Sequence, residues 1–416
     1  MHVVRSPRKL RRSRSATAAL AAWALTLAVS QPLEAVQRFS PPEPSPNLRV
    51  SPSAVQGLQS GVETYRRIVG AGGWPEIQGK STLRLGDSDA AVDVLRQRMR
   101  ITGDLARGTP DGSTFDDTVE QGVRRYQLRN GLEPTGVVYG ITLRSLNVPA
   151  QLRLTQLETN LARLQQLLPV ATAQPKYIVT NAASFELQGI ANGRVDFASR
   201  TIAGKRATPT PTVSANIQAI NILPYWHVPG TIAKAALVPA IRKDPSYLYT
   251  QNIRVYSSFG GEEIDPALVN WWGPESERYV FRQDPGPQNA LGVMRFDMPN
   301  KHIVYMHDTP MKNLFGYFER AYSAGCVRIQ NFYGLAEWVL GGQDGLTRSS
   351  LEAATAGGSA KTIKLARPVP VHFIYLTAWV EGGIVQFRND LYSRDESAAA
   401  GGESGEQKVI VYAIAP

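Results

Sequence analysis

The chain has 416 residues, a formal net charge of +10 and a single cysteine. This length allows two or three domains, each able to bury a core of its own. No run of lysine and arginine is interleaved with aromatic residues, so the sequence indicates no nucleic-acid partner despite the positive charge. A lone cysteine excludes an intramolecular disulfide and leaves one thiol whose purpose needs an explanation.

Residues 1–35 have the pattern of an export signal. Six basic residues precede an apolar segment over residues 16–29, which is shorter than the ~18 residues or more that a membrane span requires. We expect cleavage after Ser30 or Ala35, and a retained N-terminal anchor is the alternative. Cleavage after Ala35 leaves 39 basic and 34 acidic residues, a net charge of +5. A mildly basic protein of this kind suits a polyanionic, wall-like environment.

Two further segments precede the main domain. Residues 36–53 are rich in proline and predict an extended tether. In residues 83–147 apolar residues recur at helical spacing, and Asn-Gly and Thr-Gly turns separate the later helices. We expect Asp87 and Ser88 to cap the first helix. The pattern predicts a compact module of three helices.

The remainder of the chain has a mostly β pattern, which makes the fold class α+β. After an amphipathic helix over residues 150–168, short alternating segments within residues 175–395 predict a mixed or mostly antiparallel sheet or a barrel-like sandwich, with one helix near residues 332–340. Residues 224–285 are irregular and rich in aromatic residues and proline. This stretch is too long for a plain connection, so we expect a lid or capping subdomain. The tail over residues 396–416 yields no prediction.

Cys326 and His307 are the candidate catalytic pair. Cys326 follows a tight turn in the segment Ser323-Ala324-Gly325-Cys326-Val327-Arg328, nineteen residues after His307. Acyl transfer by cysteine needs a thiolate, a histidine that takes its proton, a group that orients the histidine, and N–H groups that hold the oxyanion. Gly325 allows close approach of the backbone to a reacting carbonyl. The N–H groups of Gly325 and Cys326 are therefore the expected oxyanion donors.

Alternation along two strands supports this pairing. The segment that ends at His307 predicts a strand with Tyr305 and His307 on one face and His302 on the other. After the turn, Cys326 and Arg328 also share a face. We expect both faces to border one cleft.

Other interpretations of these residues have less support. Cys326 could be a small buried apolar residue and His307 an ordinary hydrogen-bonded histidine. A zinc site would need a His-Glu-x-x-His motif or a second cysteine, and neither is present. The Ser-x-x-Lys signature of serine acyltransferases occurs only at Ser6–Lys9, inside the export signal. Export, the single thiol and the Ser-x-Gly-Cys turn favour the catalytic interpretation.

The sequence resembles a known enzyme family. His307-Asp308-Thr309-Pro310, followed by the Ser323–Arg328 segment, resembles the signature of the L,D-transpeptidases with a YkuD-type catalytic domain. The resemblance is to the large periplasmic branch, whose members carry a peptidoglycan-binding domain and a capping subdomain. It extends over roughly residues 83–395 and includes Pro224-Tyr225-Trp226 and Asn289-Ala290-Leu291-Gly292. The turns of residues 83–147 resemble the peptidoglycan-binding domain.

This resemblance implies roles for individual residues. Cys326 would be the nucleophile and His307 its base, and the main-chain carbonyl of Asp308 would orient the histidine. Gly325 and Ser323 would belong to the oxyanion turn, and Arg328 and Tyr305 would support the turn and bind substrate. The family often has a second histidine directly before the Gly-Cys pair, and this chain has Ala324 there. No cofactor and no metal are implied.

The family chemistry implies attack of Cys326 on the amide after the third residue of a peptidoglycan tetrapeptide stem, with release of the terminal D-alanine. Transfer to the amine of a second stem would give a 3→3 crosslink, which we rank first. Transfer to an outer-membrane protein would anchor that protein to the wall, and transfer to water would make the enzyme an L,D-carboxypeptidase. A non-catalytic wall-binding protein is the alternative from a different class. The expected location is the periplasm of a Gram-negative bacterium, and carbapenems are expected to acylate the thiol.

Overall fold

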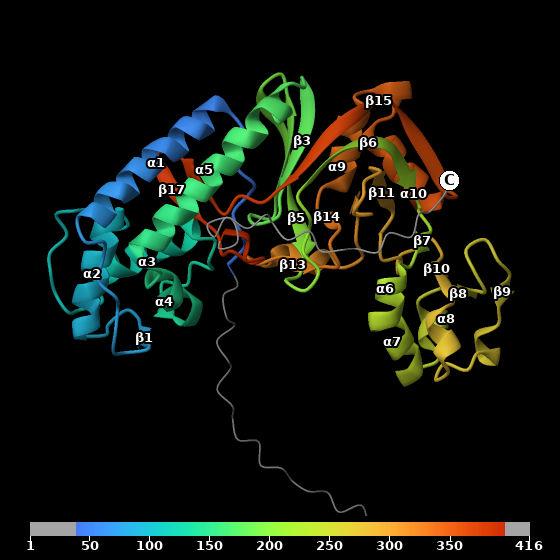
Figure 1. The fold of residues 1–416 in the computed structure, drawn as a ribbon, viewed down its shortest axis with the longest axis horizontal. Coiled ribbons are helices and arrows are strands. Elements are labelled where there is room, and N and C mark those ends of the chain that lie inside the picture. Colours follow the sequence, from blue (N-terminus) through green and yellow to red (C-terminus); the bar gives the residue numbers. More distant parts are fainter. Residues whose placement is uncertain (1–38, 396–416) are drawn as a thin grey trace, which may run out of the picture. The chain divides into compact units, whose positions relative to one another are not determined.

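The computed structural model describes residues 39–395 (Figure 1). The expected export signal over residues 1–35 and the tail over residues 396–416 lie outside the described residues. The described chain combines a large sheet, several helices and smaller sheets, which confirms the predicted α+β class. None of its helices combines the length and the apolar character needed to cross a membrane.

The module of residues 83–147 is built from three helices and a two-stranded sheet around one apolar core. Its elements are β1 (Thr82–Leu83), α2 (Ala90–Thr102), α3 (Asp117–Arg129), β2 (Val138–Tyr139) and α4 (Gly140–Leu146). The predicted caps at Asp87 and Ser88 are wrong, because Asp89 is the N-cap residue and accepts a hydrogen bond from the Ala91 amide. Asp87 instead closes the preceding turn by accepting from the Arg84 amide.

Residues 39–51 pack against the main domain, so the free tether predicted for residues 36–53 is wrong for this described part. Val50 is fully buried. The Arg49 guanidinium pairs with Glu186 at 3.0 Å and with Glu381 at 2.8 Å, and it lies 4.3 Å from the centre of the Trp379 ring. We call residues 39–51 the N-terminal strap. Its buried residues and ion pairs fix it in place.

Two long helices flank the module in the sequence. α1 (Pro52–Gly70) precedes it and α5 (Ala150–Thr172) follows it. They pack on each other and on the hairpin of β16 (Ala378–Glu381) and β17 (Ile384–Phe387). Sequence analysis did not predict α1, which contains several glycines. A Cβ atom at Gly57 or Gly61 would lie 3.2 Å from the Val380 side chain. The glycines therefore let α1 approach the hairpin, at some cost in intrinsic helix propensity.

The main domain is a mixed sheet whose strand pairings form a closed ring. The order is β13-β5-β14-β12-β11-β6-β15-β3-β4, and β4 also pairs with β5. The strands are β3 (Lys176–Asn181), β4 (Glu186–Ala191), β5 (Arg194–Gly204), β6 (Val213–Ile222), β11 (Met294–Asp297), β12 (Met306–His307), β13 (Ala321–Ser323), β14 (Val327–Ile329) and β15 (Lys361–Ile374). Most pairs are antiparallel, and β12–β14, β13–β5 and β15–β3 are parallel. The barrel-like alternative of the prediction fits this ring.

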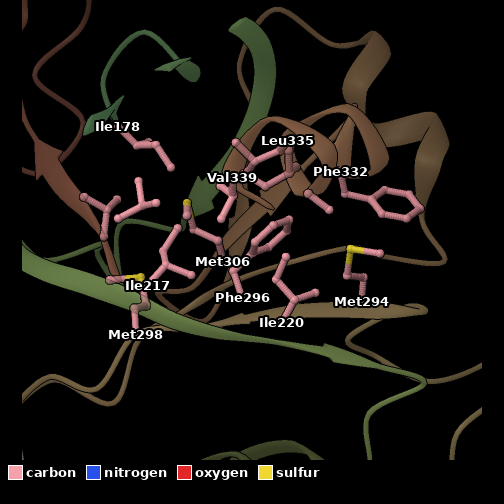
Figure 2. Packing of buried hydrophobic residues seen from close by; sticks show 14 of the residues in the cluster. Ile178, Ile217, Ile220, Met294, Phe296, Met298, Met306, Phe332, Leu335 and Val339 are labelled. Atoms are coloured by element: carbon pink, nitrogen blue, oxygen red, sulfur yellow. The ribbon is translucent and has the colours of Figure 1, made fainter. Parts of the chain in front are cut away.

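Side chains of alternate strand residues enter two cores. On β3, Ile178 belongs to the core that α9 (Phe332–Leu340) and α10 (Arg348–Gly357) help to build, and Figure 2 shows Met306 and Phe296 near Leu335 and Val339 in this core. Tyr177 and Val179 belong to the second core, with α1 and α5. The predicted helix at residues 332–340 matches α9, whereas α10 was not predicted.

The strand predicted to end at His307 is reduced to the two residues of β12. The Asn300 side chain explains this, because its amide group binds the backbone of His302 and Val304 and holds a turn before the strand. Ile303 has a φ of 54°, which a strand residue does not adopt.

Residues 224–285 form a folded subdomain, which we call the cap, so their predicted irregular character is wrong. A sheet of order β7-β10-β8-β9 packs on short helices around a separate apolar core. The elements are β7 (Trp226–His227), α6 (Gly230–Ile232), a π-helical turn (Ala233–Leu237), α7 (Val238–Lys243), α8 (Tyr247–Thr250), β8 (Ile253–Tyr256), β9 (Glu263–Ile264) and β10 (Val280–Gln283). The strands of the cap have only two to four residues and are separated by turns, so they gave no alternating pattern that could be recognised in the sequence.

Candidate active site

The register of two parallel strands brings the candidate residues together. Met306 on β12 is paired with Val327 on β14, and both side chains are buried in the main core. Because neighbouring strand residues point to opposite faces, His307 and Arg328 belong to the other face, where they are paired. Tyr305 and Cys326 directly precede the two strands and pack partly against the main core. The rings of Tyr305 and His307 are 5.7 Å apart. The strands thus bring the four candidate residues together, although the strand that ends at His307 is shorter than predicted.

The turn before Cys326 is held by side-chain hydrogen bonds. Gly325 has a φ of 120°, a conformation that favours glycine. The Ser323 hydroxyl donates to the Cys326 carbonyl at 2.5 Å and accepts from the Gly325 amide at 3.1 Å. The Thr210 hydroxyl donates to the Gly325 carbonyl at 2.8 Å. These contacts from a distant segment fix the position of the thiol.

The same contacts change the expected oxyanion donors. The Gly325 amide, predicted to be one of them, is occupied by the Ser323 hydroxyl. The Cys326 amide has no hydrogen-bond partner within residues 39–395. The Cys326 N–H is thus the backbone donor of this turn that remains available to a substrate oxygen.

His307 is buried, and a backbone group of Leu291 lies close enough to its ring to favour the charged imidazolium. The orienting role assigned to the main-chain carbonyl of Asp308 stays a prediction. The Asp308 carboxylate accepts from the Val293 amide at 3.1 Å and pairs with Lys312. Asp308 therefore fastens the loop that carries Leu291, and it supports the histidine indirectly.

Burial sets the protonation states of this ligand-free site. Burial, and then the positive charge of Arg328, lower the pKa of His307 to about 3. Burial raises the pKa of Cys326 to about 11, although Tyr305, Arg328 and Arg295 favour the thiolate. At neutral pH the thiol and the imidazole are therefore both uncharged. The His307 Nδ1 atom is buried and has no hydrogen-bond partner in the described chain.

Two side chains that sequence reasoning missed border the pair. Arg295 is paired with His307 across β11 and β12, and its guanidinium lies 5.3 Å from the centre of the Tyr305 ring. Trp226 of the cap lies close enough to the Tyr305 hydroxyl to favour its ionised form, although burial outweighs this effect and raises the pKa of Tyr305. The Pro224-Tyr225-Trp226 motif was a sequence signal for this contact, but alternation within the main domain gave no sign of it. The cap thus reaches the residues beside the cysteine.

Arg328 has hydrogen-bonding capacity that the protein does not use. Its Nε atom is buried without a partner in the described chain, and its contact through Nη1 is to the sulfur of Met311 at 3.7 Å. Its charge is close enough to Cys326 to favour the thiolate. A guanidinium in this position can bind an anionic group next to the thiol.

Comparisons with known proteins identify two matching domain families. Residues 175–369 match the family model described as "L,D-transpeptidase catalytic domain", and residues 88–146 match the model described as "Putative peptidoglycan binding domain". A curated protein of Haemophilus influenzae, named "Putative L,D-transpeptidase", is 31% identical over 219 residues. That match covers 52% of this chain and 44% of the relative, so the chain spans less than half of the length of that protein.

Solved structures give weaker matches. A mutant of the Enterococcus faecium L,D-transpeptidase is 10% identical with a TM-score of 0.24, over 48% of this chain and 50% of the other. An L,D-transpeptidase from Mycobacterium smegmatis is 13% identical with a TM-score of 0.23, over 48% and 58% of the two chains. A third, from Xylanimonas cellulosilytica, is 12% identical with a TM-score of 0.21, over 71% and 99%.

Proposed function

We propose that this protein is a cysteine L,D-transpeptidase that forms 3→3 crosslinks in peptidoglycan, because residues 175–369 match the model of the L,D-transpeptidase catalytic domain. One observation carries the proposal. His307 and Arg328 are paired across β12 and β14, Tyr305 and Cys326 directly precede these strands, and the Cys326 N–H has no hydrogen-bond partner within residues 39–395. This set contains a nucleophile, a base and an oxyanion donor.

In the proposed reaction, the Cys326 sulfur attacks the carbonyl carbon of the third residue of a tetrapeptide stem as its proton moves to His307. The Cys326 N–H holds the oxygen of the tetrahedral intermediate, and Arg328 stabilises the negative charge that develops on sulfur. The C–N bond then breaks, and the protonated imidazole returns its proton to the leaving D-alanine amine. A thioester remains on Cys326.

The second half of the reaction decides the biological product. The amine of a second stem attacks the thioester, His307 takes the proton of that amine, and the thiol is regenerated. Because water competes with the amine, we propose that the cap limits the access of water to the thioester. The alternatives are an outer-membrane protein as acceptor, and water, which would make the enzyme an L,D-carboxypeptidase.

The peptidoglycan-binding domain supports association with the cell wall. We propose that the protein acts in the periplasm of a Gram-negative bacterium after removal of the export signal, and that the domain over residues 88–146 keeps it on its substrate. A wall-binding protein without catalysis is the alternative from a different class. It would leave the shared face of Cys326 and His307 without a use.

The decisive experiment compares the wild-type protein with Cys326→Ala on tetrapeptide-bearing muropeptides. We expect wild type to release D-alanine and to gain the mass of a carbapenem, and the variant to do neither while it keeps its thermal unfolding temperature. Mass spectrometry of the products separates 3→3 dimers from tripeptides and from protein adducts. D-alanine release by the variant would contradict the proposed mechanism, and no release by folded wild type would favour the wall-binding alternative.

A further inference from the structure

The cap sheet has a polar face opposite its apolar core. On β10, Phe281 is fully buried in that core, so alternation places Arg282 on the opposite face. Arg282 is paired with His227 on β7 and with Arg254 on β8, which puts these three side chains in one row across the sheet. All three can carry a positive charge. The row therefore begins at β7, the strand whose Trp226 contacts Tyr305.

Arg282 is held in place but lacks a carboxylate at hydrogen-bonding distance. Its guanidinium lies 4.6 Å from the centre of the Tyr225 ring and 5.0 Å from that of Tyr256. The contact to Asp284 is 3.6 Å long, and the Arg282 Nε atom is buried with no partner in the described chain. Arg254, by contrast, contacts Asp284 at 2.6 Å and Glu263 at 3.2 Å. Arg282 is thus a stacked, oriented cation whose hydrogen-bonding capacity is largely unused.

The row leads toward the cysteine. Burial, and then the charges of Arg282 and Arg295, lower the pKa of His227, so both arginines lie near that ring. Arg295 lies over the Tyr305 ring, and its charge also reaches Cys326. Arg295 and Arg282 therefore lie near the uncharged His227 ring, and Arg295 also acts on the thiol. An extended peptide advances about 3.3 Å per residue, so groups further along a donor peptide bound at the thiol are the ones that can meet Arg282.

We propose that Arg282 is a specificity-determining residue that binds a free carboxylate of the acidic donor peptide, several residues away from the amide that Cys326 attacks. The proposal rests on the function proposed above, because it assumes a peptide bound at Cys326. A planar guanidinium stacked on aromatic rings is suited to two parallel hydrogen bonds with a carboxylate. The rings of Tyr225 and Tyr256 already orient the Arg282 guanidinium, so little side-chain entropy of Arg282 is lost when a carboxylate binds.

The test measures binding in the Cys326→Ala background, where chemistry cannot interfere. Calorimetry gives the Kd of a tetrapeptide stem with free side-chain carboxylates and of the same stem with those carboxylates amidated. Arg282→Gln should weaken binding of the acidic stem by about 10- to 100-fold, the range of one charge-assisted pair, and should leave binding of the amidated stem unchanged. Arg282→Lys keeps the positive charge but cannot form two parallel hydrogen bonds with a carboxylate, and it should therefore show a smaller loss of affinity for the acidic stem.

The matched control is Lys234→Gln, which removes one positive charge from an exposed position of the same subdomain. It should change neither Kd. Equal affinities of the two stems for the parent protein, or a carboxylate preference that survives Arg282→Gln, would overturn the inference. An equal loss for both stems would also overturn it, because that result indicates a structural role. Failure of the proposed function is seen separately, as the absence of D-alanine release by a protein with native Cys326.

Discussion

The module of residues 83–147 and the candidate active site differ in how their buried charged groups are paired. In the module, the buried Arg129 guanidinium contacts the buried Asp104 carboxylate through two hydrogen bonds of 2.6 and 2.5 Å. In the candidate site, Arg328 Nε and His307 Nδ1 have no partner in the described chain. The module also contains unpartnered buried atoms, Arg96 Nε and Asn130 Oδ1, so the difference lies in the Arg129–Asp104 ion pair, for which the candidate site has no counterpart around His307 and Arg328.

This difference has an energetic basis. A buried polar group without a hydrogen bond costs about 1–3 kcal/mol, and natural proteins keep few of them. At His307 and Arg328, a bound molecule can supply the missing partner. The comparison predicts that substitutions in the site reduce activity with little loss of stability, and that substitutions of the paired charges elsewhere reduce stability.

The largest effect is expected at His307, the proposed catalytic base. Replacement of His307 by Ala removes the group that takes the thiol proton, so kcat/KM for D-alanine release should fall by ~10²–10⁴-fold. His302 lies before the strand and outside the shared face, and His302→Ala should cost far less. Steady-state kinetics of both variants provides the measurement. Equal losses would mean that the register of β12 assigns the wrong histidine to the site.

A smaller effect, on stability, is expected in the module. Asp104→Ala leaves the Arg129 charge buried and unpaired, which costs about 3–5 kcal/mol. Asp111→Ala is the matched control, because Asp111 also pairs with an arginine but is 84% exposed, and exposed pairs contribute about 1 kcal/mol or less. Urea denaturation followed by circular dichroism gives both free energies of unfolding. Similar losses for the two variants would contradict the distinction between buried and exposed pairs.

The shared face of the site could be predicted from the sequence because it depends on local rules. Alternation over a few residues predicted Tyr305 with His307 and Cys326 with Arg328, and the register of β12 and β14 places His307 beside Arg328. The contact of the Leu291 backbone with the His307 ring could not be found in this way. It comes from a backbone group on another segment, and no side-chain pattern marks a carbonyl for such a role.

The missed elements of the fold have a similar explanation. The glycines of α1 weaken the helical pattern in the sequence. They are needed because the Val380 side chain, more than 300 residues later in the chain, packs closely against the helix. The strap was taken for a tether because proline-rich composition describes an isolated chain. Arg49 holds it through Glu186 and Glu381, which are remote in sequence. Long-range contacts of this kind override local preference, and one sequence alone does not specify them.

The smallest effect is expected where the strap meets the main domain, and it depends on pH. Burial alone would raise the pKa of Glu381, but the charge of Arg49 and hydrogen bonds from Ser45, Arg49 and Asn47 outweigh burial and lower it to about 2. Because the folded-state pKa lies below the ordinary value of 4.5, this stabilisation is present above pH 4.5 and is lost as the pH falls toward 2. Glu381→Gln should therefore lower the free energy of unfolding by ~1–3 kcal/mol at pH 7, and the difference from wild type should shrink on acidification below pH 4.5.

The control is Glu43→Gln. The Glu43 side chain pairs with Arg200 but is 85% exposed, so this pair should contribute little to the free energy of unfolding at any pH. A difference between Glu381→Gln and wild type that stays constant from pH 7 to pH 3 would show that the carboxylate acts by packing, and the strap would then not be held by charge.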